Sequence, residues 1–355
     1  MSEGMLTTAI GAMTGLMTAI VTSFLIPFFQ KKQERGEQRR SVHEKYAQPL
    51  AADAVNLLWR LNEILFKGRA QYLREDAPAT TFNVYKRIST CYRIAVILGW
   101  IRAIEQEQSY LFYGEEKSQT DLRRAVSDLE SALADSPHVE VHVLRRLAKL
   151  WDLALPEDRD EVARIAACAN AEMQHVLAEY RLVRYHDMLD LNGPRQLEAV
   201  RRIGGAVATA MNRPPVEDAV LAATAAEALG HIAIRQAWIY RDWQQAIGAL
   251  MVRPVEGAAR RFDVLDYGAF EALVTDGTGS EKVWVDRLEA ALVGIDAVQP
   301  DPTDFRIDQL RRVARATAAL VCAIERLDLD RRILEADACE LARKLLTEIP
   351  ARGEG

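Results

Sequence analysis

The sequence predicts an all-α protein with a single N-terminal transmembrane helix followed by a cytoplasmic multi-helix bundle. One observation behind this prediction is that no charged residue occurs between Glu3 and Lys31. The other is that apolar side chains recur at three- and four-residue steps through most of the remaining chain, which is typical of amphipathic helices. We therefore divide the chain into a transmembrane anchor at 1–30, a basic juxtamembrane collar at 31–45, and a helical domain at 46–350 that can be subdivided near 193 and 253.

The length of the apolar segment favours a membrane span. As a helix, Met5 to Phe29 would extend about 37 Å at about 1.5 Å per residue, and a hydrocarbon core is about 30 Å thick. A buried helix of a globular protein rarely runs so far without a charged residue on its wet face. A secretory signal would have basic residues in front and small residues at a cleavage point, whereas this segment has Glu3 in front and ends in the bulky "SFLIPFF". A retained transmembrane helix is the favoured interpretation.

Basic residues after the span predict its orientation. The collar contains Lys31, Lys32, Arg35, Arg39 and Arg40. Positive flanks stay on the cytoplasmic side, so we expect a single-pass protein of the cell (inner) membrane. Its short N-terminus would lie outside and its C-terminal domain in the cytoplasm. The collar can also contact anionic head groups, although a simple stop-transfer flank is favoured over specific lipid recognition.

Small residues within the span predict self-association. A stripe for transmembrane association recurs at every fourth position: Thr7, Gly11, Gly15, Ala19 and Ser23. Such stripes let two helix backbones pack closely in lipid. A neighbouring stripe of hydroxyls comprises Thr14, Thr18 and Thr22, which can bond to helix carbonyls or to a partner helix. The alternative is an ordinary span in which small residues are common.

The composition indicates a folded body and excludes some partners. The chain is 49% hydrophobic and 27% charged, with a net charge of −6, which suits a folded protein and argues against a nucleic-acid partner, because phosphate binding needs a basic face. The cysteines are Cys91, Cys168, Cys322 and Cys339. They form no CxxC pair, so we interpret all four as free and buried in a reducing compartment.

Apolar spacing predicts the helices of the body in order. The first would run from Pro49, in its first turn, to about Leu73, and the second from Phe82 to Tyr113, paired antiparallel with it. The remaining helices are expected within 117–136, after Pro137, across 156–191 up to "NGP", at 195–211, at 216–252, at 305–327 and at 330–349. The region 253–304 is less regular and would hold a two-stranded element or short helices, followed by a linker at 299–304.

Three sequence patterns resemble metal or phosphate sites but are incomplete. His138 and His142 are four residues apart with Glu140 between them, yet a metalloprotease motif places Glu directly after the first His. Glu172 and His175 have the spacing of di-iron bundles, which need a second such pair, and the nearest candidate, Glu227 with His231, has a different spacing. The loop "DGTGSEK" at 276–282 matches no phosphate-binding motif. Surface histidines and a loop with Ser280 as N-cap are the favoured interpretations.

An aromatic segment is the remaining candidate for a binding surface. "RQAWIYRDWQQ" contains Trp238, Tyr240 and Trp243 together with Arg235 and Arg241. Trp, Tyr and Arg dominate protein-binding hot spots, but burial within the bundle is favoured over an exposed surface.

Taken together, these features favour a membrane-anchored, self-associating helical interaction or scaffold protein without an evident catalytic motif. The alternative is a membrane-disrupting effector or small channel assembled through the span, and a third interpretation is an enzyme with its site in 253–304. We expect membrane lipid and a second copy of the chain as partners, a protein partner of unknown identity, no cofactor, no metal and no nucleic acid. Whether the protein is an enzyme stays open at this point.

Overall fold

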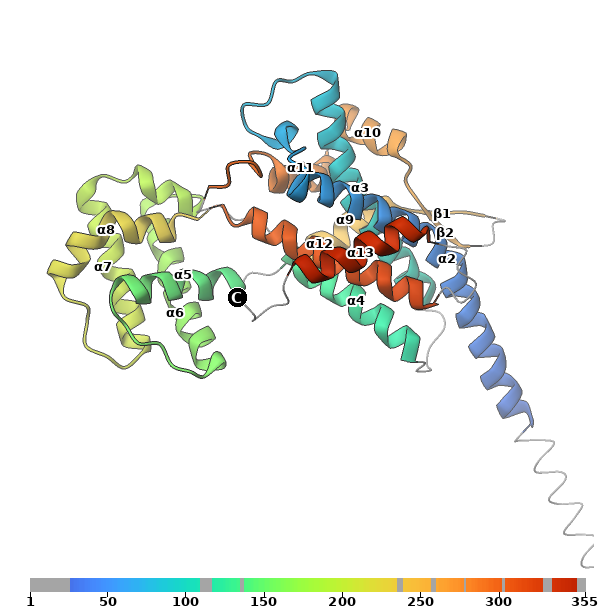
Figure 1. Ribbon diagram of the computed structural model, residues 1–355, viewed down its shortest axis with the longest axis horizontal. Coiled ribbons are helices and arrows are strands. Elements are labelled where there is room, and N and C mark those ends of the chain that lie inside the picture. Colours follow the sequence, from blue (N-terminus) through green and yellow to red (C-terminus); the bar gives the residue numbers. More distant parts are fainter. Residues whose placement is uncertain are drawn as a thin grey trace, which may run out of the picture.

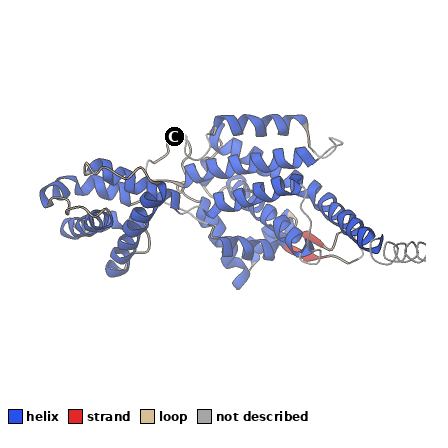
Figure 2. Cartoon of the chain, turned by 90° about the horizontal axis from the view of Figure 1, so that it is seen from below, coloured by secondary structure: helices blue, strands red, loops and turns tan. Residues whose placement is uncertain are grey.

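The computed structural model describes residues 26–108, 117–134, 137–234, 239–256, 260–277, 279–301, 304–327 and 334–349. Helices dominate these residues, which confirms the predicted all-α class (Figure 2). In chain order the elements are α2 (Ile26–Phe66), η2 (Gln71–Leu73), α3 (Thr81–Gln108), α4 (Lys117–Ala134), α5 (Pro137–Leu150), α6 (Arg159–Tyr180), η3 (Tyr185–Asp190), α7 (Gly193–Ala210), α8 (Asp218–Ile232), α9 (Arg241–Met251), β1 (Val252–Pro254), β2 (Phe262–Val264), α10 (Tyr267–Asp276), α11 (Ser280–Leu292), α12 (Arg306–Leu327) and α13 (Ala336–Glu348).

The buried apolar side chains form two clusters. The larger one, which we call the body, joins α2, α3, α4, α9 and α10–α13. The smaller one, the lobe, takes nearly all its members from Val139 to Ile234, with Phe305 added from a distant part of the chain. Figure 1 shows α5–α8 gathered at one end of the molecule, while the N-terminal part of α2 leaves from the opposite end. The subdivision expected near residues 193 and 253 stays a prediction about independently folding units.

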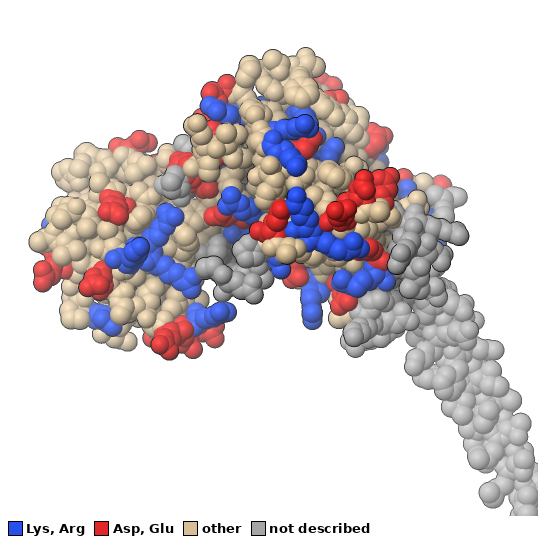
Figure 3. Space-filling model, in the orientation of Figure 1, with Lys and Arg blue, Asp and Glu red and all other residues tan. Residues whose placement is uncertain are grey.

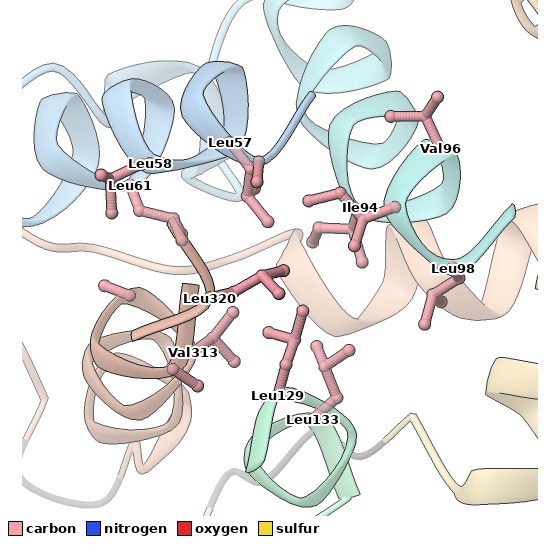
Figure 4. Packing of buried hydrophobic residues seen from close by; sticks show 14 of the residues in the cluster. Leu57, Leu58, Leu61, Ile94, Val96, Leu98, Leu129, Leu133, Val313 and Leu320 are labelled. Carbon is pink, nitrogen blue, oxygen red and sulfur yellow. The ribbon is translucent and has the colours of Figure 1, made fainter. Parts of the chain in front are cut away.

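The centre of the body is a four-helix contact. Leu57 of α2, Ile94 of α3, Leu129 of α4 and Leu320 of α12 point toward one another (Figure 4), and all four are buried. The three- and four-residue spacing of the apolar side chains on each helix makes this convergence possible, because it places them on one face. Burying side chains of this size contributes roughly 1.5–3 kcal/mol each to folding.

The first predicted helix has different limits from those expected. Pro49 was predicted in its first turn, but it lies inside α2, which begins at Ile26 and ends at Phe66. A proline in a helix interior removes one hydrogen bond to the carbonyl four residues earlier. That carbonyl belongs to Lys45, which is exposed, while Tyr46 beside it is fully buried. The helix nevertheless continues through Pro49, with Tyr46 and Leu50 buried on either side of it.

Helices α3 and α9 approach closely because glycines face each other's helix. A Cβ added to Gly248 of α9 would lie 2.7 Å from the carbonyl oxygen of Leu98 in α3. A Cβ on Gly99 of α3 would lie 2.8 Å from Cβ of Met251 and 2.8 Å from Cγ1 of Val264. Real Cβ atoms do not come this close, so both positions need a glycine to hold α9 and strand β2 against α3.

The two short strands form the sheet in the described part of the chain. β1 and β2 pair antiparallel, with Val252 opposite Val264 and Pro254 opposite Phe262. Together with α10 and α11 they give the region 253–304 both a two-stranded element and short helices, as the sequence allowed.

A buried arginine connects α2 to α3. Arg60 is buried, and its guanidinium donates to the hydroxyls of Tyr72 at 3.3 Å and Thr90 at 3.1 Å and to the carbonyl of Lys86 at 3.1 Å. Its Nε lies 3.4 Å from a carboxylate oxygen of Glu63. A buried charge needs such partners, and this set of contacts fixes the register of two antiparallel helices.

The lobe contains shorter helices than the sequence suggested. The predicted helix across 156–191 divides into α6 and η3 because Arg181 adopts a left-handed conformation, with φ of 56°, and caps α6. Asp158 caps the start of α6 by accepting from the amide of Glu161 at 2.8 Å, and Asn192 caps α7 in the same way. The predicted helix 216–252 likewise divides into α8 and α9, separated by the segment around 233–240.

Body and lobe meet at the start of α12. Phe305 joins the lobe cluster, while its neighbours Asp304 and Arg306 form a buried ion pair at 2.7 Å. Arg306 also donates to the carbonyl of Val293 at the end of α11. The end of the predicted linker is thus a fixed joint, with one aromatic ring in the lobe and the flanking charges bonded to the body.

None of the helices among the described residues combines the length and apolarity needed to cross a membrane. Most of the predicted span lies in residues 1–25, outside the described residues.

Candidate functional site

The sequence-predicted site residues at the N-terminus remain predictions. The association stripe (Thr7, Gly11, Gly15, Ala19, Ser23) and the hydroxyl stripe (Thr14, Thr18, Thr22) lie outside the described residues. The collar residues Lys31, Lys32, Arg35, Arg39 and Arg40 lie on α2, but their side chains are outside the description.

The described residues of the histidine motifs contact other side chains, and the side chain of His138 lies outside the described residues. The ring of His142 packs edge-on against Phe305 with 4.9 Å between centroids. His175 is 73% exposed and lies 3.5 Å from Glu172. Glu172 also pairs with Arg202. Among the residues that the structure describes, no group of three His, Cys, Asp or Glu side chains could hold a metal ion.

The Gly-rich loop has an ordinary helix start. Gly279, with φ of 89°, is the N-cap of α11 and Ser280 is its first residue, so the prediction of Ser280 as N-cap was off by one position. Lys282 of this loop pairs with Asp286 one turn later at 2.7 Å. The interpretation of 253–304 as an enzyme site stays a prediction.

The described cysteines are not all buried. Cys91, Cys322 and Cys339 are buried as expected, whereas Cys168 on α6 is exposed, so the prediction for that residue was wrong. Cys168 lies on the outer face of an Ala-rich helix, where a small residue is compatible with either environment. Burial raises the pKa of the Cys339 thiol to about 11, which makes it a poor nucleophile at neutral pH.

The aromatic segment forms a cluster around an arginine of another helix. Arg287 of α11 stacks between two indoles, with its guanidinium carbon 4.3 Å from the ring centre of Trp243 and 4.6 Å from that of Trp284. Tyr240 packs edge-on against Trp243 at 4.9 Å, and Arg241 pairs with Glu130 at 3.0 Å. Trp238 and Arg235 of this segment lie outside the described residues.

On the face shown in Figure 3, Lys and Arg side chains are interspersed with Asp and Glu. Each stack of Arg287 on an indole is worth about 0.5–2 kcal/mol.

The structure contains a cavity that the sequence did not reveal. It has a volume of about 210 Å³ and lies in the lobe, between α5, α6 and the end of α8. Its polar lining consists of Glu140, Asn170, Gln174, Tyr185 and Tyr240. Apolar side chains such as Val143, Met173 and Ile232 complete the walls. Such a mixture of apolar walls and a few polar groups is typical of small-molecule sites.

The polar side chains that line the cavity form a chain of hydrogen bonds in which each donor points toward Glu140. The amide of Gln174 donates to the Tyr185 hydroxyl, that hydroxyl donates to Oδ1 of Asn170, and Nδ2 of Asn170 donates to Oε1 of Glu140 at 2.9 Å. Burial raises the pKa of Tyr185 to about 12, so its phenol keeps the proton that it donates. This chain of hydrogen bonds thus ends at the carboxylate of Glu140.

One wall of this cavity has a signal in the sequence, whereas the meeting of its other walls has none. Ala166, Asn170, Met173 and Gln174 have the spacing of one face of α6. The sequence interpretation instead considered Glu172 and His175 of the same helix, which lie on another face. These two residues pair with each other, and Glu172 also pairs with Arg202.

Comparisons with models of known protein families, with curated proteins and with solved structures find no match.

Proposed function

We propose that this chain is a membrane-anchored helical interaction protein that self-associates through its N-terminal span. The observation that carries the proposal is the continuity of α2. This helix begins at Ile26, within the predicted span, passes the collar and packs one face into the body from Tyr46 onward. The 15 residues of the collar at 31–45 would separate membrane and body by about 22 Å at about 1.5 Å per residue.

A continuous helix gives the anchor a mechanical role. A flexible linker would let the body rotate freely, whereas a helix fixed in the core transmits the orientation of the span to the body. Because α2 leaves the body at the end opposite to the lobe (Figure 1), the lobe would extend away from the bilayer. Close packing of two spans through Gly11 and Gly15 would then hold two bodies in a defined relation.

The hydroxyl stripe supports a second candidate function. Thr14, Thr18 and Thr22 would line a polar path if several spans assembled with this face inward. The second candidate is therefore a small channel or membrane-disrupting effector. Conductance across a planar bilayer by the full chain separates this candidate from a scaffold, because a scaffold would assemble without carrying ions.

Site-directed labelling tests the anchor. Ser2→Cys and Ser41→Cys would be made in a Cys168→Ser background, because Cys168 is exposed whereas Cys91, Cys322 and Cys339 are buried. A membrane-impermeant maleimide should modify Ser2→Cys from outside and Ser41→Cys from the cytoplasmic side. Labelling of both positions from the same side would overturn the anchor.

A further inference from the structure

Exposed aromatic side chains gather on one side of the helix pair α2 and α3. Four of them are between 41% and 63% exposed: Trp59 and Phe66 of α2, and Phe82 and Tyr85 of α3. Phe82 and Tyr85 are three residues apart and therefore share one face of α3. Apolar residues scattered singly on a surface need no explanation, whereas a contiguous exposed patch is typical of an interaction site.

An ion pair between the two helices shows that the aromatic side chains of α2 and α3 are neighbours. Glu63 lies one turn from both Trp59 and Phe66, and its carboxylate is 3.2 Å from Nζ of Lys86 on α3. The same ammonium lies 5.8 Å from the centre of the Phe82 ring. The exposed aromatic rings thus surround one ion pair, and we call this surface the α2–α3 face.

The carboxylate of this ion pair is shared by several cations. The guanidinium groups of Arg60 and Arg69 also approach Glu63, at 3.4 and 3.6 Å. Arg69 is held beside the end of α2 because its backbone amide donates to the carbonyl of Glu63 at 3.1 Å. Together with Lys86, three cations therefore contact one carboxylate.

Two further cations on this side form no ion pair with a described carboxylate. Lys67 follows Phe66 at the end of α2 and is exposed. Arg93, two turns after Lys86 on α3, donates to the backbone carbonyl of Asn56 on α2. Both side chains can therefore accept a carboxylate from outside.

The carboxylates at the edges of the α2–α3 face do not balance these cations. Asp53 accepts from the indole nitrogen of Trp100 at 2.8 Å. Glu271 accepts from the hydroxyl of Tyr267 at 2.8 Å, and the Tyr267 ring packs edge-on against Tyr85. With these two residues included, the cations still outnumber the carboxylates, so the α2–α3 face attracts acidic groups.

Two other occupants fit this surface less well. A second copy of the chain would bring the same cations against one another, which is unfavourable. A bilayer lies far away under the proposed anchoring, because Phe66 is about 30 Å beyond Tyr46 along α2 at about 1.5 Å per residue. A helix suits the shape, since two packed helices present ridges and grooves to a third.

We propose that the α2–α3 face docks an acidic amphipathic helix of another protein, whose apolar side chains cover the aromatic rings while its carboxylates pair with Lys67, Lys86 and Arg93. Helices bind such surfaces through anchors at i, i+3, i+4 and i+7, and Trp, Tyr and Arg dominate hot spots. The inference rests on the proposed role as an interaction protein, for which it names the partner chemistry, and it needs neither the span nor self-association.

Fluorescence anisotropy of the full chain in detergent tests this proposal, because detergent keeps the chain in solution whether or not its N-terminus anchors a membrane. The probe is a labelled synthetic helix with leucines at i, i+3, i+4 and i+7 and glutamates between them. Its counterpart has lysine in place of every glutamate, and micelles without protein measure partition into detergent. The acidic peptide should bind about tenfold more tightly than the basic one, with a smaller difference at high salt.

Equal binding of the two peptides, or no binding of the acidic peptide at millimolar concentrations, overturns the proposal. Such a result would not affect the proposed anchor, which maleimide labelling tests separately.

Two variants locate the binding. Phe82→Ala removes the most exposed of the four rings, and Lys67→Glu reverses a cation without a described ion pair. Each should weaken binding of the acidic peptide about tenfold. Val183→Ala and Lys149→Glu are the matched controls, since both residues are exposed in the lobe, and they should bind like the parent. Circular dichroism verifies the fold, and unchanged affinity in Phe82→Ala and Lys67→Glu contradicts this surface as the site.

The same variant tests the other occupants. Flotation with phosphatidylglycerol vesicles measures contact with a bilayer, and sedimentation velocity in detergent measures contact between copies. Either interaction, if present in the parent and lost in Phe82→Ala, would assign the α2–α3 face to that occupant and overturn the proposal.

Discussion

Phe305 packs its ring edge-on against His142, with 4.9 Å between the ring centroids and 74° between the ring planes. The two residues are far apart in sequence, and the helices next to them belong to different parts of the fold. His142 lies on α5 of the lobe, whereas Phe305 directly precedes α12 of the body. Arg146, one turn after His142, lies over the same ring at 5.9 Å. This aromatic contact therefore joins the lobe to the body.

The first prediction concerns this joint. Phe305 is 5% exposed, and Phe305→Ala should destabilise the lobe by about 3 kcal/mol, because truncating a buried phenylalanine leaves a cavity. Hydrogen exchange is the measurement, since it reports local opening. Amides of α5–α8 should exchange faster, while those of α3 and α12 stay protected.

Phe82→Ala is the matched control. Phe82 is 63% exposed, so its truncation should change stability by less than about 0.5 kcal/mol. Unchanged exchange of α5–α8 in Phe305→Ala would show that the Phe305 ring does not stabilise the lobe.

The second prediction concerns the contact of α3 with α9. Gly248→Ala would place a Cβ 2.7 Å from the carbonyl oxygen of Leu98, a backbone atom that cannot turn aside. Overpacking of this kind typically costs about 1–3 kcal/mol. Denaturant unfolding of the full chain should show a lower midpoint with an unchanged slope.

Gly230→Ala is the control and should not lower the stability of the protein. A Cβ at Gly230 in α8 meets nothing within 4 Å, and alanine is the better helix former by about 1 kcal/mol. This variant should be at least as stable as the parent. A Gly248→Ala protein as stable as Gly230→Ala would show that α9 shifts without cost.

Apolar spacing predicted the helical class and most helices of the body, because packing on one face is encoded locally. The limits of α2 were not predictable in this way, since Pro49 lies inside the helix and not in its first turn, where proline is favoured. The end of α6 depends on Arg181 in a left-handed conformation, which a glycine would have signalled and an arginine does not. The cavity depends on α5, α6, Tyr185 and Tyr240 meeting in three dimensions, and no local pattern contains that information.

The third prediction concerns pH. Burial raises the pKa of Tyr185 to about 12, from about 10 in an unfolded chain. Between these values the folded state keeps the phenol proton and the unfolded state releases it. The stability that the raised pKa of Tyr185 contributes to the folded state is therefore fully present below about pH 10 and is lost as pH rises toward about 12.

Tyr185→Phe removes this titration. Ionisation of Tyr185 favours the unfolded chain, so the parent loses stability as pH rises over this interval, whereas Tyr185→Phe has no such group to ionise. The unfolding free energy of the parent relative to that of Tyr185→Phe should therefore fall over this interval. Urea unfolding at several alkaline pH values measures the difference. Parallel pH profiles of the two proteins would show that Tyr185 ionises as it does in an unfolded chain.

The last prediction tests self-association through the small-residue stripe. Gly15→Leu would place a bulky side chain where a partner backbone needs to approach. Insertion itself should not suffer, because leucine is more apolar than glycine and a better helix former. Crosslinking in native membranes should fall for Gly15→Leu. Leu16→Ile, one position off the stripe, is the control and should crosslink like the parent.

Fusing residues 1–40 to an inert monomeric reporter separates association through the span from any association through the body. Equal association of Gly15→Leu and Leu16→Ile in that format would mean that any oligomer is held by the helical body. If Gly15→Leu abolishes association, valine at Thr14, Thr18 and Thr22 becomes the next change, because valine keeps the shape and removes the hydroxyls. Ion leakage that disappears in this triple variant while crosslinking persists would favour the channel. No leakage in the parent would favour the scaffold, since close packing alone provides no polar path across the bilayer.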